Sequence, residues 1–496
     1  MAGYIAGGNR RQMNFMCIDD MISENSNVRA IDAIVDTMEK TKHKFIHAET
    51  KETGRPPHNP VRMFKLYIYC YYEKIRSSRK IEAECNRNME LMWLMEGVTP
   101  DHKCIAEFRR QNKAAIKEAF SEFIEICDSL GLIGKDLTAI DGSKFRANNA
   151  RKKNITIGKI NKKLEYFHRL LEEHNRELEK NDSKTDKVKT KINELNDLKE
   201  SIEEQGVKEI SLTDPDSRLM GTANAGYEVS YNVQTSVDSK CDLVVVTDVI
   251  NNAADQGQLY RMAKQTAEVF GATEEKPLTA LGDKGYFEGE DIQSCEDDPL
   301  INAIVAKSEE QGNDGYQKSK FIYDAEKDQY TCPQKQILHR IGQKKRDYIN
   351  KRACRECKFR EQCTKNKSGR TITRSQYEEA IESAVKRFSE NKELYKKRQM
   401  IVEHPFGTIK RGLGFTYFLT RGIENVRTEN RMHMLTYNIK RVLNIFSVPD
   451  LTCKLKEIRG KMQGNQGDNS VVILSLLRFL PMFKLYKGNP AKFANI

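Results

Sequence analysis

Two short apolar runs in the sequence each lead into an aspartate with a glycine close behind it. Residues 137–145 read LTAIDGSKF, and residues 278–287 read LTALGDKGYF. Apolar runs of this length that stop at a glycine are typical of buried strands, so we expect one strand to end at Asp141 and another at Asp283. Taken alone, an aspartate in such a place is more often a turn residue than a catalytic one.

A third carboxylate, Glu403, lies in a basic and helical context, with Lys410 seven positions further on. Seven residues make about two helical turns, so the two side chains share a face if the helix continues between them. Pro405 and Gly407 fall inside this segment, and we therefore expect a kink or a helix start just after Glu403.

Residues 139–145, 283–287 and 403–410 together resemble the motifs of bacterial insertion-sequence transposases that have an aspartate-aspartate-glutamate (DDE) triad. The resemblance implies that Asp141, Asp283 and Glu403 bind two Mg²⁺ (or Mn²⁺) ions. Carboxylates in an open site suit Mg²⁺, and two such ions can activate the attacking oxygen and stabilise the leaving one. The implied reaction is cut-and-paste DNA transposition, in which 3′ ends are cleaved at terminal inverted repeats and transferred into target DNA.

Related transposases often carry a tyrosine, an arginine, the glutamate and a lysine on one helix. Tyr395 and Lys410 can be matched to this set, and the resemblance implies that Lys410 holds a phosphate of the DNA. Gln399 occupies the place of the arginine, four residues before Glu403, while Arg398 is one step off. The role of the arginine in positioning DNA therefore stays open.

Four cysteines lie between the second aspartate and the glutamate: Cys332, Cys354, Cys357 and Cys363. Cys354 and Cys357 form a CxxC pair, which lets two thiolates reach one tetrahedral ion, and the other two cysteines can complete a structural Zn²⁺ site. Scattered thiols are the alternative, because a zinc ribbon usually has two CxxC pairs. Basic residues flank the cysteines, so this insertion is also a candidate contact for the DNA backbone.

The composition favours an anionic polymer as partner, since 83 Lys and Arg against 71 Asp and Glu give a net charge of +12. No stretch is long and apolar enough for a membrane span, and residues 471–477 are too few. The start of the chain lacks a signal-peptide core. We therefore expect a cytoplasmic, nucleoid-associated bacterial protein that binds double-stranded DNA and no membrane, with its twelve cysteines as thiols or metal ligands.

The order of the expected elements is that of an α/β, ribonuclease-H-like core with a mixed sheet. A half-buried strand over residues 227–237 and a buried partner over 243–247 follow the first strand. A helix over 256–270, the strand that ends at Asp283, a short helix from Gly289 and a strand over 301–306 come next, and the glutamate helix comes last. Asp214 and Asp216, which flank a proline, are expected to be turn residues.

We expect an N-terminal helical DNA-binding domain (1–135), a catalytic domain (136–450) and a C-terminal tail (451–496). Basic residues on the N-terminal helices, Arg79 and Lys80 among them, suit a DNA-binding bundle, and a solvated basic face fits the sequence equally well. The resemblance favours DNA-end recognition. Two insertions interrupt the catalytic domain: a helical hairpin (157–206), whose apolar stripe could join protomers of a homodimer or larger assembly on DNA, and the four-cysteine segment (308–388).

Two alternatives to a transposase remain. A ribonuclease-H-like nuclease would cut DNA without transposing it, and a zinc-stabilised DNA-binding protein would use the carboxylates only structurally. Metal dependence of cleavage separates an enzyme from a binding protein, and joining of cut ends to a target separates a transposase from a nuclease.

Overall fold

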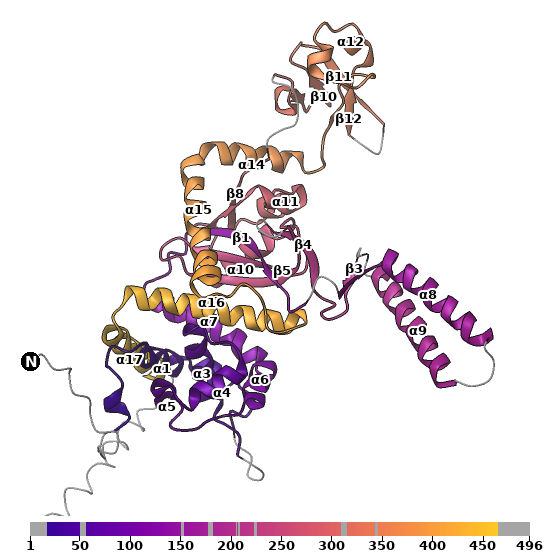
Figure 1. The fold of residues 1–496 in the computed structure, drawn as a ribbon. Coiled ribbons are helices and arrows are strands. Elements are labelled where there is room, and N and C mark those ends of the chain that lie inside the picture. The colour runs from indigo at the N-terminus through magenta and orange to yellow at the C-terminus, as the bar shows by residue number, and fades with distance from the viewer. Residues whose placement is uncertain are drawn as a thin grey trace, which may run out of the picture.

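The fold is known from a computed structural model that describes residues 17–49, 56–149, 153–176, 182–204, 206, 209–222, 226–308, 315–342 and 346–464. A mixed sheet lies at the centre, with the N-terminal helices on one side of it and a cysteine-bearing insertion at the opposite end (Figure 1). A helical arm projects sideways. Among the helices so described, none is long and apolar enough to cross a membrane. Residues 471–477, considered above as a membrane segment, lie outside the described part.

The central sheet has six strands in the order β4-β5-β1-β7-β8, with β6 also paired to β5. β1, β7 and β8 are parallel to one another, whereas β5 is antiparallel to β1 and to both β4 and β6. The strands are β1 (Leu137–Arg146), β4 (Arg218–Thr222), β5 (Gly226–Asp238), β6 (Val244–Ile250), β7 (Leu278–Gly282) and β8 (Ile301–Val305). The sequence analysis did not predict β4, which pairs with the first residues of β5.

The expectation that a strand ends at Asp141 is wrong, because Asp141 lies in the middle of β1. The strand continues to Arg146, paired with β5 from Thr138↔Asp238 to Arg146↔Ser230. Gly142 marks a close approach and not a turn, since a Cβ there would lie 2.5 Å from Asp255 Oδ1 and from Gln234 Nε2. Asp283, in contrast, directly follows β7.

The expected half-buried strand over 227–237 is also wrong, because β5 is buried on both faces from Val229 to Asp238. Helices cover both sides of the sheet: α10 (Leu259–Phe270) packs on β5, β6 and β7, while α15 (Lys392–Gly407) packs on β1, β5 and β7, and α16 (Ile423–Ile445) on β6. α11 (Gly289–Asp297) and α14 (Glu378–Glu390) pack together beside β8. A strand between two helical layers needs no polar face.

The helix that carries Glu403 does not start after Glu403, as one expectation had it. α15 continues through Pro405 to Gly407 and passes into a wide π-helical turn, η5 (Thr408–Gly412). A proline inside a helix removes one backbone hydrogen bond, and the buried faces of Pro405 and Phe406 against the sheet hold the helix together there.

The N-terminal part is helical and packs against α16, which lies between these helices and the sheet (Figure 1). Its elements are η1 (Asp19–Met21), α1 (Asn27–Thr37), α2 (Glu39–Lys42), α3 (Pro60–Tyr72), α4 (Ser78–Cys85), α5 (Met89–Leu94), α6 (His102–Gln111) and α7 (Lys113–Ser129). Side-chain amides and carboxylates cap several of them, as Asn59 and Asp101 do at α3 and α6. One hydrophobic cluster runs from these helices into the sheet.

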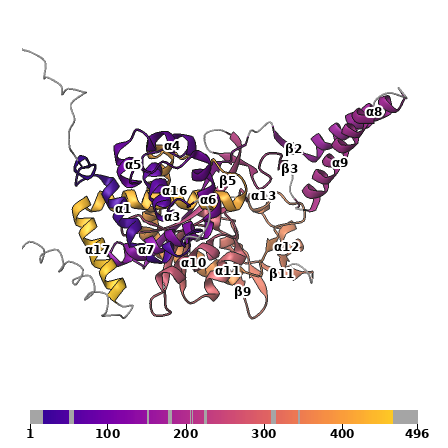
Figure 2. The same cartoon turned by 90° about the horizontal axis from the view of Figure 1, so that it is seen from below.

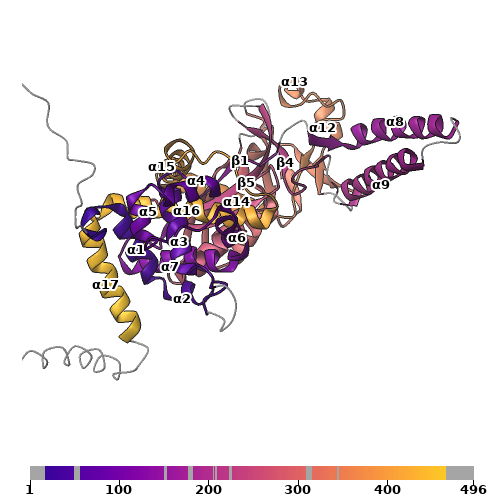
Figure 3. The same ribbon diagram turned by 60° about the horizontal axis from the view of Figure 1, so that its bottom comes forward.

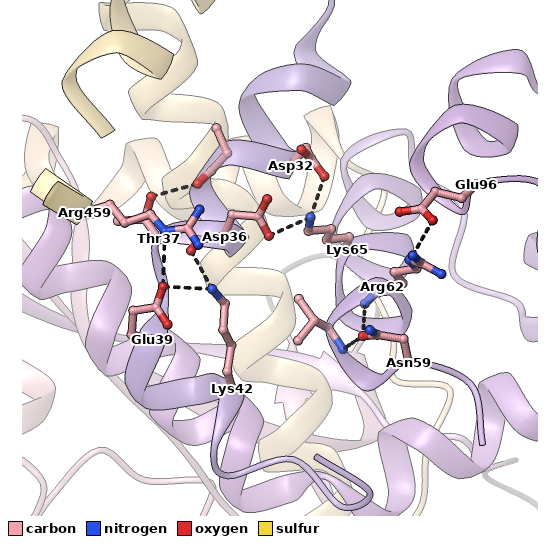
Figure 4. A network of polar contacts seen from close by, with 12 residues as sticks. Asp32, Asp36, Thr37, Glu39, Lys42, Asn59, Arg62, Lys65, Glu96 and Arg459 are labelled. Atoms are coloured by element: carbon pink, nitrogen blue, oxygen red, sulfur yellow. Dashed lines mark hydrogen bonds and ion pairs between the residues drawn. The ribbon is translucent and has the colours of Figure 1, made fainter. Parts of the chain in front are cut away.

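A final helix, α17 (Val448–Gly464), returns from the end of α16 and lies against α1 (Figure 2). Figure 4 shows the polar contacts here: Arg459 of α17 pairs with Glu39 at 3.3 Å, and Lys65 of α3 pairs with Asp32 and Asp36 of α1 at 2.6 and 2.7 Å. The C-terminal helix is therefore part of the N-terminal bundle.

The arm consists of α8 (Ile157–Arg176) and α9 (Asp182–Glu204), which pack on each other and project away from the sheet (Figure 3). A two-stranded sheet of β2 (Asn154–Thr156) and β3 (Glu209–Ser211) forms its base. The arm has a small hydrophobic cluster of its own, formed by Ile155, Ile160, Leu195, Ile202 and Ile210.

The cysteine-bearing insertion is built on a five-stranded antiparallel sheet in the order β13-β12-β11-β10-β9. Its elements are η4 (Lys318–Lys320), β9 (Ile322–Asp324), β10 (Gln329–Thr331), β11 (Ile337–Ile341), β12 (Asp347–Ile349), α12 (Lys351–Arg355), α13 (Arg360–Cys363) and β13 (Ile372–Thr373). Aromatic and aliphatic side chains such as Phe321, Tyr330 and Tyr348 form a separate small core.

Candidate active site

Asp141 and Asp283 lie at the same level on neighbouring parallel strands. The last paired residues of β1 and β7 are Ala139 and Leu281, and each aspartate follows two residues later. Asp283 begins the short 3-10 helix η3 (Lys284–Tyr286), where its Oδ1 accepts a hydrogen bond from Gly285 N at 2.8 Å. The two carboxylates therefore lie close together where β7 ends beside the middle of β1.

Burial raises the pKa of Asp141 to about 6, and the charge of Asp283 pushes it in the same direction. The guanidinium of Arg398 opposes this shift, with Nη1 3.8 Å from Asp141 Oδ1. A half-buried carboxylate beside a second one is costly to ionise unless a cation lies close to both. The strand pair thus creates a place where added positive charge is stabilising.

Arg398 and Tyr395 come from the same face of α15, one helical turn apart, and the guanidinium lies 6.0 Å from the tyrosine ring centre. Burial raises the pKa of Tyr395, and the charges of Asp283 and Asp141 add to that effect. Both side chains therefore face the aspartate pair. The sequence position of Arg398, one step from the expected place, did not reveal this contact.

Glu403 lies on the exposed side of α15, where its Oε1 accepts a hydrogen bond from Gln399 Nε2 at 2.8 Å. Among the described residues, Glu403 does not join Asp141 and Asp283 in a cluster of three side chains that could hold one ion. The structure brings the two aspartates together and leaves the predicted third carboxylate at the rim.

Lys410 reaches from η5 to β1, where its Nζ donates to Ser143 Oγ at 2.6 Å and to the Lys144 carbonyl at 2.8 Å. Burial lowers the pKa of Lys410 to about 8, against the opposing charge of Asp141. The ammonium also lies 4.5 Å from the ring centre of Phe145. The π-helical turn thus places a cation next to the aspartate strand.

Asp255, which sequence reasoning missed, lies against the backbone of both aspartate motifs. Its Oδ1 accepts hydrogen bonds from Asn232 Nδ2 at 2.7 Å and Gln234 Nε2 at 2.8 Å, and it pairs with Lys144 at 3.4 Å. A Cβ on Gly285 would lie 3.7 Å from Asp255 Oδ2. Asp255 stands in a polar stretch just before α10, and nothing in its local sequence distinguishes it from a turn residue.

The side-chain oxygens around Asp141 and Asp283 are of the kind that binds divalent cations. Within the part of the chain that the structure describes, no three His, Cys, Asp or Glu side chains are gathered closely enough to hold one ion. Asp141 and Asp283 supply two carboxylates, and the buried Asn232 Oδ1, which has no hydrogen-bond partner, adds an unsatisfied oxygen. Carboxylate and amide oxygens are the ligands that hard cations such as Mg²⁺ prefer.

Cys332, Cys354, Cys357 and Cys363 all line one small cavity of about 30 Å³ in the insertion. Burial raises the pKa of the Cys363 thiol, and the other three cysteines raise it further. Gly369 adopts a left-handed conformation next to Cys354, and a Cβ there would come within 2.6 Å of the Cys354 Cβ. The four thiols therefore share one cavity, but within the described part of the chain they are not gathered closely enough to hold a single ion as they stand.

The predicted DNA-binding residues of the N-terminal helices divide into two groups. Arg79 and Lys80 are exposed on α4. Arg76 and Arg109, basic residues of the same helical region, are committed to packing instead. Arg76 is 9% exposed and donates to the Tyr417 carbonyl at 2.7 Å, and Arg109 donates to Tyr71 Oη at 2.8 Å.

Residues 16–111 match the family model of a transposase domain (DUF772), and residues 331–443 match that of a transposase DDE domain. No curated protein matched the chain. Among solved structures, the chain is similar to a cryo-EM structure of the piggyBac transposase synaptic complex with hairpin DNA. That match has 6% identity and a TM-score of 0.33, and it covers 90% of this chain and 83% of that one.

The second match spans all four cysteines of the insertion together with Glu403 and Lys410, while Asp141 and Asp283 lie between the two matched segments. The structural likeness is too weak to support an argument about the fold. Both matched segments are transposase domains, one of them a DDE domain, and the two matches are consistent with the DDE-type insertion-sequence transposases that the motifs of the chain resemble.

Proposed function

We propose that this transposase cleaves DNA at the 3′ ends of an insertion sequence and joins those ends to target DNA, with divalent metal ions at Asp141, Asp283 and Glu403. DDE transposases in general use divalent metal. The observation that carries the proposal is the meeting of Asp141 and Asp283 at one level of the sheet, with Arg398 and Lys410 beside them. Such a site holds carboxylates for a metal and cations for a phosphate.

The strand order supports a ribonuclease-H-like core. An antiparallel strand pair followed by two parallel strands on the other side of β1 is the order expected from the sequence. In this arrangement, β1 and β7 deliver the two aspartates, and a later helix, α15, delivers the glutamate. Mg²⁺ (or Mn²⁺), two ions per site, would supply the activated water or 3′-hydroxyl and stabilise the leaving oxygen.

The residues of this chain have distinct tasks in the proposed reaction. Asp141, Asp283 and Glu403 would hold the cations through their carboxylate oxygens. Lys410 and Arg398 bind the non-bridging oxygens of the scissile phosphate, because both present positive charge next to the aspartates. Tyr395 packs against Arg398 and limits its rotamers.

The remaining assignments are proposed on the same basis. Residues 1–135 recognise the inverted repeats, with Arg79 and Lys80 on the exposed face of α4 against the duplex. Residues 136–450 form the catalytic part with the two insertions, and the C-terminal segment after residue 450 begins with most of α17, which packs on the N-terminal bundle. The four cysteines bind a structural Zn²⁺, which their shared cavity supports. The arm joins protomers when two ends are brought together.

The test is a cleavage and joining assay with supercoiled plasmid that carries the element ends, in Mg²⁺ and in EDTA. Wild-type protein should release 3′ ends and join them to a second plasmid only with the metal. Asp141→Asn, Asp283→Asn and Glu403→Gln should each abolish both steps while duplex binding stays within about twofold, since the carboxylates hold metal and do not grip DNA. Asp297→Asn, an exposed aspartate on α11, is the matched control.

Each outcome separates the candidate functions. Cleavage without joining would identify a nuclease, and binding without cleavage would identify a DNA-binding protein. Full activity of Glu403→Gln would remove Glu403 from the metal site and leave the two aspartates.

A further inference from the structure

A hollow of about 660 Å³ opens at the far end of β1, five residues beyond Asp141. Its walls come from the end of β1 and the residues after it, from the start of β5, and from the loop between η5 and α16. Residues of the arm base, Lys153 and Thr213, complete one side. A concave site of this size fits a small ligand or one to two nucleotides, and it is too narrow for a duplex.

The hollow combines exposed aromatic rings with cations. Tyr227 is 60% exposed and Tyr417 is 40% exposed, although large aromatic side chains are usually covered. Arg146, Lys153 and Arg421 are exposed around them, and Glu228, 3.8 Å from Arg146, is the acid in the lining. Rings interleaved with cations are typical of surfaces that bind single-stranded nucleic acid.

Backbone hydrogen bonds fix the shape of the hollow. Arg146 N donates to the Thr416 carbonyl at 3.2 Å, and Phe418 N donates to the Arg146 carbonyl at 2.9 Å. Behind the wall, the buried guanidinium of Arg76 lies 4.7 Å from the ring centre of Tyr417. The tyrosine and its loop are therefore held in place before any ligand arrives, which reduces the entropy cost of binding.

Both main walls continue directly from the proposed catalytic site. β1 leads from Asp141 to Arg146, and the loop that carries Tyr417 follows η5, which carries Lys410. Five residues of a β-strand span about 17 Å, so a DNA strand bound at the aspartates reaches the hollow after a few nucleotides. The hollow thus lies within reach of a DNA strand that is held at the site.

We propose that this hollow binds unpaired nucleotides of the DNA strand that is held at the catalytic site, an inference that rests on the proposed function. Bases stack on the rings of Tyr227 and Tyr417, and Lys153 and Arg421 bind the adjoining phosphates. The exposed tyrosine rings favour an unpaired base as the ligand, because a base inside a duplex is stacked and has no free ring face. Duplex phosphates would need only the cations.

The experiment measures binding of three DNAs to the full chain carrying Asp141→Asn, so that nothing is cut: a single strand, a duplex with a single-stranded overhang, and a blunt duplex. Tyr227→Ala should weaken binding of the single strand and the overhang by about tenfold and leave the blunt duplex unchanged. Tyr227→Phe should restore binding, because the ring face remains. Tyr166→Ala, a 53% exposed tyrosine on α8, is the matched control.

A second readout uses 2-aminopurine placed at successive positions of the overhang, whose fluorescence should be quenched where it stacks on a ring and recover in Tyr227→Ala and in Tyr417→Ala. Equal losses on all three DNAs would show a phosphate-binding surface only, and no loss on any would show that the hollow takes no DNA; either result overturns the proposal. These binding measurements do not depend on cleavage. An absence of metal-dependent cleavage in the wild type would therefore refute the proposed function separately.

Discussion

The N-terminal helices and the two insertions are attached to the sheet in different ways. The helices share one continuous hydrophobic cluster with it, which includes Phe64 of α3, Phe123 of α7, Leu435 of α16 and Ile140 of β1. The arm and the cysteine-bearing insertion instead have small clusters of their own. The proposed division at residue 135 is therefore one of function, because the core crosses it.

A buried polar network strengthens the same junction. Glu429 of α16 is fully buried and accepts hydrogen bonds from Leu419 N at 3.0 Å and from Thr420 N and Oγ1 at 2.9 and 2.7 Å. Arg76 lies 3.8 Å from the same carboxylate. The fully buried His433 stacks on Phe415, and burial lowers its pKa well below the usual range. The N-terminal helices thus support the loop that forms the hollow.

The largest expected effect is the loss of the fold when the N-terminal helices are removed. A chain that starts at Gly134 would expose the faces of α16 that pack on α3 and α7, and each large apolar side chain left uncovered costs about 1.5–3 kcal/mol. We expect insoluble protein or no cooperative thermal transition by circular dichroism. A soluble fragment with a melting temperature near that of the full chain would show that the catalytic part folds alone.

The contrast explains what the sequence could predict. The helical character of the N-terminal part and the apolar runs of β6, β7 and β8 are local signals, and the expected elements are found there. The end of the strand through Asp141 was predicted wrongly because Gly142 looks like a turn residue. Glycine is needed there for another reason, since a Cβ would collide with Asp255, which comes from a distant loop. Residue pairs separated by a hundred positions leave no local trace.

The candidate site shows the same limit. The resemblance of the three motifs implied a phosphate-transfer site with Lys410 beside the carboxylates, and the sheet brings Asp141 and Asp283 to one level. Arg398 facing Asp141 depends on the rotation of α15, and the position of Lys410 depends on a π-helical turn. Ideal helical spacing cannot give either of these.

The second prediction addresses the buried network. Glu429→Ala should lower the free energy of unfolding by about 3–5 kcal/mol, because it leaves Arg76 without its buried partner and three donors of the loop unpaired. The measurement is urea denaturation followed by fluorescence. Glu84→Ala, which removes the partner of the exposed Arg87, is the control and should change stability by less than about 0.5 kcal/mol. Equal effects of the two substitutions on the free energy of unfolding would show that the buried network stabilises the protein no more than a surface ion pair does.

The third prediction concerns the cysteine-bearing insertion, where damage should stay local. Protein purified without chelator should contain about one zinc per chain, and Cys357→Ser should lose it and become sensitive to proteolysis within residues 315–374. The main thermal transition should move little, because the cluster around Tyr348 is separate from the central one. Cys453→Ser, at an exposed cysteine of α17, should retain the zinc. Zinc-free wild-type protein would refute the metal site.

The smallest effect on stability is expected from removing the arm. Thr156 of β2 lies opposite Glu209 of β3, so an Asn-Gly turn can replace residues 157–208 and close the hairpin. Ile155 and Ile210 are changed to threonine in this variant, because the arm helices no longer cover them. The free energy of unfolding should change by no more than about 1 kcal/mol, since the central cluster contains none of the arm residues. If the arm joins protomers, the mass of the complex with element ends, measured by light scattering, should correspond to one protomer for the shortened chain and to two for the full chain. A shortened chain that melts many degrees earlier would show that the arm supports the core, and one that still pairs on DNA would assign assembly to another surface.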